Sequence, residues 1–342
     1  MPHEQFRPPD HPHDAFLLAT VVGSFPQPAW LERVRELADE EPDIDIEEVH
    51  DDACKACVSD QERAGLNVVT DGEMRREGMV EYFTHFINGY DLDGEGSGWN
   101  REMPSVVDTI SSDGSWLVDD FGFADEIASV PVKTTITGPF TLASFASLEA
   151  YDDVEALAYD FADLVAAEAE RLAAAGAPWI QIDEPALGMS PHEEIAHECL
   201  TRISERVPSD TRLGVHICSG NYENLVPALF DFPVDEVDLE FASDDADDPA
   251  DILGDADLSS DIGFGVVNSA SKEIDSVEEI RANIEQALEL VPPERLTLTP
   301  DCGLKPLTRE SARGKVQNLA TAVREVEAAM DQGEVPAPAA GD

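Results

Sequence analysis

The chain has 342 residues, of which 42% are hydrophobic, and its 73 acidic residues against 21 basic ones give a formal net charge of −52. A chain of this length can bury a sizeable core, either as two ordinary domains or as one large α/β barrel. The negative charge would repel nucleic acid and anionic membranes, so we exclude both as partners and interpret the charge as a solvated surface suited to a very salty cytoplasm.

The two ends of the chain have compositions typical of poorly ordered segments. Residues 1–14 are rich in proline and histidine, and residues 331–342 end in EVPAPAAGD after a predicted helix, so we expect a flexible N-terminal arm and a flexible C-terminal tail. Residues 15–330 form the predicted barrel domain. Without a basic start followed by an apolar segment, and without an apolar stretch that could span a bilayer, we expect a soluble cytoplasmic protein with reduced thiols.

Short apolar runs alternate with helical patterns between these ends. In chain order the predicted strands are residues 17–22, 66–71, 132–137, 179–183, 213–218, 236–241, 262–267 and 296–300. Helical patterns at 45–65 and 154–176 separate some of them, and Gly176 is a natural C-cap. The alternation predicts an α/β fold, a single-domain (β/α)8 TIM barrel with an insertion at 84–130 between its second and third strands. A doubly wound open sheet is the alternative, but no GxGxxG motif follows the first strand.

A histidine and a cysteine end the fifth predicted strand two positions apart. His216 and Cys218 therefore point to one face of that strand, and an imidazole with a thiolate favours zinc. Active-site residues of such barrels lie where strands end, and there Glu240 lies at the end of the sixth strand and Cys302 follows the eighth. The sequence thus predicts a zinc site formed by these four residues.

The remaining cysteines have a simpler interpretation. Cys54 and Cys57 lie three positions apart in a helical pattern, so they share one helix face, and no second pair completes a structural zinc site. Cys199 also lies in a helical stretch. We expect all three to be core residues.

Seven segments, in order, resemble the catalytic barrel of the cobalamin-independent methionine synthase family. They are VVGSFPQP (21–28), GLNVVTDGEMRREGMVEYF (65–83), TGPFTL (137–142), QIDEPAL (181–187), VHIC (215–218), DLEF (238–241) and TPDCGLKPL (299–307), and the resemblance covers roughly residues 17–328. It implies a barrel enzyme in which zinc activates homocysteine for S-methylation. The family's zinc ligands fall on the same four residues, His216, Cys218, Glu240 and Cys302.

The resemblance also implies how homocysteine is bound. Glu73 and Asp183 match the acidic residues that meet the substrate ammonium, and we take these two as the catalytic and substrate-binding carboxylates. The substrate carboxylate would meet backbone N–H groups and the hydroxyl of the Gly23–Ser24 turn. The alternative for Asp183, and more so for Glu184, is capping of a helix that begins at Pro185.

One departure from the family concerns the methyl donor. The long enzymes carry an additional N-terminal barrel and use methyl-tetrahydrofolate polyglutamate, and they have a histidine where this chain has Ala270. A methyl group on a tertiary amine needs a general acid to leave, whereas a methyl group on cobalt does not. We therefore expect methylcobalamin or a corrinoid protein as the donor.

Two other functions remain open. A related zinc alkyltransferase could use coenzyme M as its thiol, although that thiol has no ammonium group for Glu73 and Asp183 to bind. A non-catalytic barrel that binds zinc or homocysteine is the second alternative, because the matching histidine and the additional barrel are both missing.

Overall fold

The computed structural model describes residues 2–38, 40–41, 43–91, 104–218, 222–226, 228–254 and 256–335. Its main sheet has seven strands in the order β1-β10-β9-β8-β7-β6-β4. These strands are β1 (Leu18–Ala19), β4 (Lys133–Thr137), β6 (Trp179–Asp183), β7 (Arg212–Ile217), β8 (Glu236–Leu239), β9 (Asp261–Val267) and β10 (Leu296–Pro300). The pairs β1–β10, β10–β9 and β6–β7 are parallel. Seven of the eight expected strands are therefore present, and the α/β barrel class is confirmed.

The remaining expected strand, residues 66–71, forms only an isolated bridge between Val69 and Val132. Its backbone still bonds on both sides, because Asn67 N donates to Ala19 O (3.0 Å) and Lys133 N donates to Val69 O (2.8 Å). A regular ladder does not form because side chains occupy the backbone groups. The Gln61 amide, for example, donates to the carbonyl of Thr70 (2.9 Å) and accepts from its N–H (3.0 Å).

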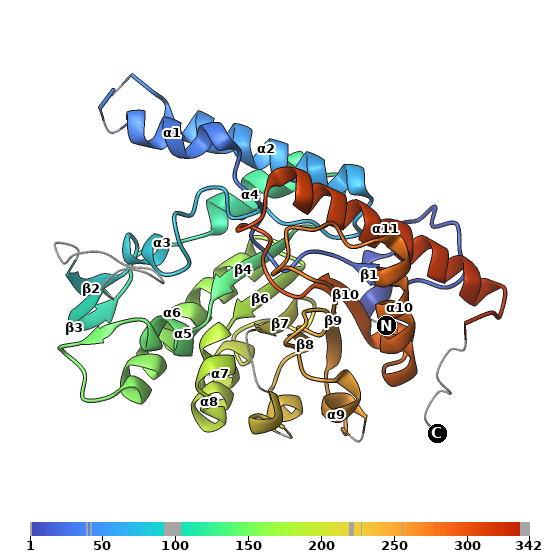
Figure 1. The fold of residues 1–342 in the computed structure, drawn as a ribbon. Helices are drawn as coiled ribbons and strands as arrows, with labels where there is room; N and C mark the ends of the chain where they lie inside the picture. The colour runs from blue at the N-terminus through green and yellow to red at the C-terminus, as the bar shows by residue number, and fades with distance from the viewer. Residues whose placement is uncertain are drawn as a thin grey trace. The chain divides into compact units, whose positions relative to one another are not determined.

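The chain folds into two compact units, the first made of residues 1–75, 122–133 and 238–342. Its helices are η1 (Pro2–Phe6), α1 (Ala29–Ala38), α2 (Ile46–Ala64), α9 (Pro249–Leu253), α10 (Val277–Leu290), η4 (Pro293–Arg295) and α11 (Arg309–Asp331). Helix α11 packs against α2 and α10 (Figure 1). The helix expected at 45–65 is confirmed as α2, which begins after the capping carboxylate of Asp45 and ends at Gly65, whose φ is 97°.

The second unit comprises residues 76–121 and 134–237. It contains a small sheet of β2 (Asn88–Asp91), β3 (Ser105–Ser111) and β5 (Ser147–Leu148), and the helices α3 (Glu81–Thr84), α5 (Pro139–Ser144), α6 (Val154–Ala174), α7 (Pro185–Met189), α8 (Glu193–Ser204), η2 (Tyr222–Asn224) and η3 (Ala228–Asp231). Helix α6 packs against α5 and α8 (Figure 1). The predicted insertion at 84–130 contributes β2, β3 and α4 (Val118–Ile127), and its glycine-rich stretch at 92–103 lies outside the described residues.

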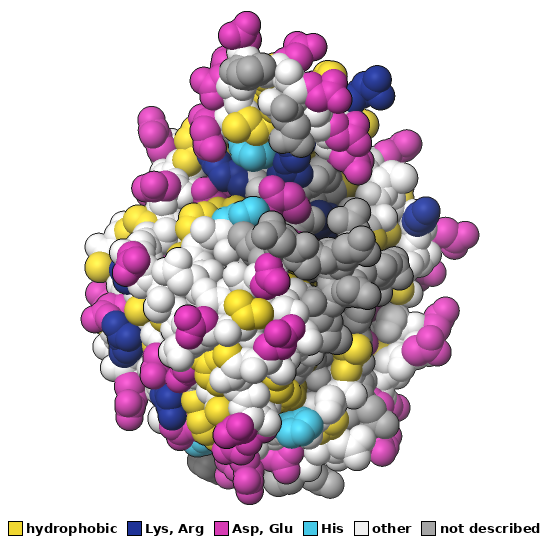
Figure 2. Space-filling view, turned by 90° about the vertical axis from the view of Figure 1, so that its left-hand side faces the viewer, with side chains coloured by type: hydrophobic (Ala, Val, Ile, Leu, Met, Phe, Trp, Pro, Cys, Tyr) yellow, Lys and Arg dark blue, Asp and Glu magenta, His cyan; other side chains and the backbone are white. Residues whose placement is uncertain are grey.

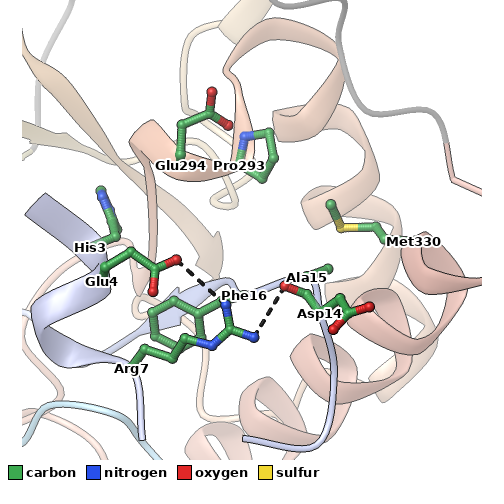
Figure 3. Close-up of a pocket in the computed structure, with 9 residues that line it drawn as sticks. All are labelled: His3, Glu4, Arg7, Asp14, Ala15, Phe16, Pro293, Glu294 and Met330. Atoms are coloured by element: carbon green, nitrogen blue, oxygen red, sulfur yellow. Dashed lines mark hydrogen bonds and ion pairs between the residues drawn. The ribbon is translucent and has the colours of Figure 1, made fainter. Parts of the chain in front are cut away.

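The N-terminal segment, which we expect to be a flexible arm, has contacts with helix α11 in this structure. His3 and Phe6 are only 3% exposed, and the rings of His11 and His13 lie 3.3 Å and 2.9 Å from carboxylate oxygens of α11. Beside the segment lies a pocket of about 180 Å³ (Figure 3), lined by His3, Glu4, Arg7, Asp14, Ala15, Phe16, Pro293, Glu294 and Met330. None of the predicted site residues lines it.

The acidic residues are distributed as the sequence suggests. On the face drawn in Figure 2, Asp and Glu side chains occur throughout and outnumber Lys and Arg. Within the described residues, no helix combines the length and the apolar character needed to cross a bilayer. The predicted tail is described as far as Val335, and residues 336–342 lie outside the described part.

Candidate active site

Three of the four predicted metal ligands come together. His216 lies in β7, Cys218 directly follows that strand, and Cys302 follows β10. Each offers one ligand atom, and the three atoms lie within 4.8 Å of one another. Ligands of a tetrahedral zinc ion are roughly 3.3–3.8 Å apart, because Zn–S and Zn–N bonds are about 2.3 and 2.0 Å long. Small side-chain adjustments would therefore let this group hold a metal ion.

The fourth predicted ligand, Glu240, is not part of this group. It directly follows β8 and is half-buried. Its position relative to the Cys302 segment is nevertheless defined, since the carboxylate of Asp301 accepts hydrogen bonds from the N–H groups of Phe241 (3.0 Å) and Ala242 (2.8 Å). The main chain after Glu240 is thus joined to the residue before Cys302.

The predicted substrate carboxylate Asp183 lies next to the predicted ligand His216. The two are paired residues in the parallel ladder of β6 and β7, so their side chains leave the sheet on the same side. The Gln181 amide donates to the Asp183 carboxylate at 2.7 Å and fixes its direction. Asp183 is half-buried, whereas His216 is buried. A cation bound by Asp183 would therefore lie close to the metal-ligand group.

Glu184 has a capping role, but for a helix other than the expected one. Its carboxylate accepts from the N–H groups of Phe140 (2.9 Å) and Thr141 (2.8 Å), in the first turn of α5. Its own N–H donates to the carbonyl of His216 (2.8 Å). Burial raises the pKa of Glu184 to about 7 despite these bonds. Pro185 occupies the first turn of α7, as the sequence predicted.

Glu73, the other predicted substrate carboxylate, lies in a tight turn. Its φ is 58°, and it is the sole non-glycine residue with a positive φ in the part of the chain that the structure describes. The turn packs closely against helix α2, because a Cβ on Gly72 would lie 2.3 Å from Cys57 Sγ. Left-handed backbone costs a side-chain-bearing residue free energy, and such strain concentrates at functional sites. The turn therefore presents Glu73 in a conformation that local energetics alone would not select.

The predicted Gly23–Ser24 turn lies beside the segment that carries Cys302. A Cβ on Gly303 would lie 2.2 Å from Ser24 Oγ, and Leu304 N donates to Ser24 O (2.8 Å). The Thr70 hydroxyl holds the turn by donating to Gly23 O (2.7 Å). The Ser24 hydroxyl therefore lies beside Gly303, the residue that follows the predicted metal ligand Cys302.

The loop after β9 carries Ala270, which is exposed. The side-chain oxygen of Asn268 accepts from the N–H groups of Ala270 (2.9 Å) and Ser271 (3.1 Å), and the Nζ of Lys315 donates to the carbonyl of Asn268 (2.8 Å). Position 270 is thus part of an ordered loop at a strand end, and its side chain has no proton to donate.

The other cysteines are in the core, as expected. Cys54, Cys57 and Cys199 are at most 3% exposed. Burial raises the pKa of Cys57 well above its usual value and that of Cys199 as well, so both thiols are protonated and unreactive at neutral pH.

Asp301 lies in the segment TPDCGLKPL, directly before the predicted ligand Cys302, and had no predicted role. The sequence offers two weak signs of a role for it. Asp301 directly precedes a candidate ligand, and the preceding predicted strand has glycine at alternate positions (GFG, 263–265). Burial, together with the nearby charges of Glu240 and Cys302, raises the pKa of Asp301 to about 7, although two backbone hydrogen bonds oppose the shift.

Comparisons with known proteins place these features in context. The family described as "Cobalamin-independent synthase, Catalytic domain" matches residues 17–325. Methionine synthase of Sulfurisphaera tokodaii is 34% identical over 310 residues, 89% of this chain and 90% of the relative, and that of Pyrococcus furiosus is 34% identical over 92% of this chain and 94% of the relative. The solved B12-independent methionine synthase from Shewanella sp. W3-18-1, in complex with selenomethionine, has a TM-score of 0.81 and 26% identity, over 92% of this chain and 99% of that one.

Proposed function

Because the chain belongs to the cobalamin-independent methionine synthase family, we propose that it methylates the thiol of homocysteine at a zinc ion held by His216, Cys218 and Cys302. The observation that carries this proposal is the convergence of two thiols and one imidazole within 4.8 Å at strand ends. Thiolate and imidazole ligands select zinc over the harder divalent cations. Zinc at this position would lower the pKa of the homocysteine thiol, so that its sulfur is deprotonated at neutral pH.

Glu240 is the proposed fourth ligand in the substrate-free enzyme. A carboxylate oxygen is a harder ligand than a thiolate, so it is the group that yields to the homocysteine sulfur. Its half-buried side chain and its location directly after β8 support this exchange. His216, Cys218 and Cys302 would stay bound throughout.

Asp183 and Glu73 would bind the ammonium group of homocysteine. Asp183 is paired with His216 on the adjacent strand, and Glu73 lies in a turn with a positive φ. The backbone therefore determines where both carboxylates lie. The backbone N–H groups and the hydroxyl of the Gly23–Ser24 turn would receive the substrate carboxylate. These contacts orient the substrate so that its sulfur faces the proposed ligands.

The methyl donor is the finer part of the proposal. Ala270 cannot donate a proton, so the donor should be one whose leaving group needs no protonation, which favours methylcobalamin or a corrinoid protein over methyl-tetrahydrofolate. Such a donor would act as a substrate and not as a resident cofactor. The comparisons support no particular donor, and this choice rests on Ala270.

The test is methionine formation by zinc-loaded protein in high salt, with methylcobalamin and methyl-tetrahydrofolate in parallel reactions. We expect methionine from homocysteine with methylcobalamin, little with the folate, and no methylation of coenzyme M. Good turnover of the folate alone would overturn the donor proposal. A zinc-loaded protein that methylates no thiol from any donor would instead indicate a binding protein.

A further inference from the structure

We propose that Asp301 is a positioning residue that fixes the main chain after Glu240 relative to Cys302. This inference rests on the proposed function. Asp301 directly precedes Cys302 and is 1% exposed. Its backbone N–H donates to Val267 O (2.9 Å), so the residue is anchored to β9 before its side chain is considered.

The side chain of Asp301 bonds to the segment that follows Glu240. Its Oδ1 atom accepts from the N–H groups of both Phe241 (3.0 Å) and Ala242 (2.8 Å). A single carboxylate oxygen thus joins the chain beside one proposed ligand to the chain beside another.

Gly265 makes room for this connection. Strand β9 lies between β8 and β10 in the sheet, so the Asp301 side chain must pass over β9 to reach residues 241 and 242. A Cβ on Gly265 would lie 2.3 Å from Asp301 Oδ1 and 3.1 Å from Glu240 Cα. Any side chain at position 265 would displace the carboxylate.

A second connection of the same kind lies along the same three strands. Thr299 Oγ1 donates to Asp238 Oδ1 (2.8 Å), and a Cβ on Gly263 would lie 2.3 Å from that oxygen. It joins β10 to β8 across β9 as Asp301 does, but involves no proposed ligand. It therefore provides a matched control.

The consequence for function concerns ligand exchange. If Glu240 yields to the substrate sulfur and later returns, a main chain fixed by Asp301 confines that movement to the Glu240 side chain. Without the connection, the loop after β8 would move with its carboxylate, and the return of the ligand would be slower. Groups that orient metal ligands in this way typically change metal affinity or activity about 10–100-fold when they are removed.

The variants distinguish the loss of the two hydrogen bonds to Asp301 from the loss of its negative charge. Asp301→Ala removes the acceptor and Gly265→Ala displaces it. Asp301→Asn keeps an oxygen for both N–H groups, and its amide would replace Oδ2, which has no hydrogen-bond partner among the described residues. Thr299→Val breaks the control connection.

Three quantities are measured: hydrogen exchange of the Phe241 and Ala242 amides in metal-free protein, zinc release to a chelator, and kcat/KM for homocysteine. For Asp301→Ala and Gly265→Ala we expect faster amide exchange, zinc release about tenfold faster or more, and kcat/KM lower by about 10–100-fold. Asp301→Asn and Thr299→Val should stay within about threefold of the wild type in zinc release and kcat/KM.

The proposal is overturned if Asp301→Ala matches Thr299→Val in all three measurements, or if Asp301→Asn is as impaired as Asp301→Ala, which would assign the effect to charge. Failure of the proposed function is a different result: the wild-type protein itself would bind no zinc or form no methionine. In that case the amide exchange still decides whether Asp301 fixes the chain.

Discussion

Asp183 and His216 are paired residues on adjacent parallel strands, and their side chains leave β6 and β7 on the same side. A carboxylate proposed to bind substrate and an imidazole proposed to bind metal are thus fixed next to each other by backbone hydrogen bonds. The separation of their roles can be tested, because the first acts on the substrate ammonium and the second on the metal.

Asp183→Asn should raise the KM for homocysteine about 10–100-fold and leave zinc content unchanged, because a hydrogen bond to a charged group is worth about 1.5–3 kcal/mol. 4-Mercaptobutyrate, which is homocysteine without its ammonium group, serves as the control substrate in steady-state assays with both enzymes. If its KM rose as much as that of homocysteine, Asp183 would not be the ammonium-binding group.

Cys302→Ser should lose zinc and activity together, with zinc affinity reduced at least about 100-fold, because a serine hydroxyl is a poor zinc ligand at neutral pH. Zinc content and circular dichroism are measured on the same preparation. Cys199→Ser is the matched control, since that thiol is buried elsewhere and should not affect zinc. Retention of stoichiometric zinc by Cys302→Ser would contradict the assignment.

The strain at Glu73 predicts opposite effects on stability and activity. Glycine adopts a φ of 58° without the penalty paid by other residues, so Glu73→Gly should be about 1 kcal/mol more stable than Glu73→Ala. Both variants should lose activity because both lack the carboxylate. Urea denaturation and methionine assays measure the two effects, and equal stability of the two variants would show that the turn is unstrained.

His50 predicts a pH dependence of folding. Burial and the charges of Arg35 and Arg75 lower its pKa from 6.5 to about 4, and the ring accepts a hydrogen bond from Arg35 Nε (3.0 Å). Between pH 6.5 and 4 the unfolded chain binds a proton that the folded one does not, so the free energy of unfolding falls as the pH falls, by up to roughly 3 kcal/mol. His50→Gln keeps an acceptor and should flatten this part of the curve; an unchanged curve would contradict the prediction.

The sequence predicted those features that depend on local pattern. The two-residue spacing of His216 and Cys218 defines one face of a strand, and Cys302 follows another strand end, so a barrel fold places these groups at one rim. The helix at 45–65 depends on local pattern as well, because its capping residues Asp45 and Gly65 bond to backbone groups only a few residues away.

Other features depend on pairings between distant segments and could not be predicted. Glu184 caps α5 and not the helix that follows it, and Asp301 bonds across β9 to residues about 60 positions away. The N-terminal segment packs because α11 presents carboxylates to its histidines, which neither segment reveals alone. Likewise, the side chains of Gln61 and Asn67 form hydrogen bonds with backbone groups that the ladder expected at 66–71 would have used.

Zinc-edge absorption spectroscopy of the zinc-loaded protein, before and after addition of homocysteine, tests the central proposal most directly. The account predicts two sulfur ligands and one imidazole at first, with an oxygen completing the shell, and a third sulfur in place of that oxygen once homocysteine is bound. A zinc shell without two protein sulfurs, or one that gains no sulfur from the substrate, would contradict it.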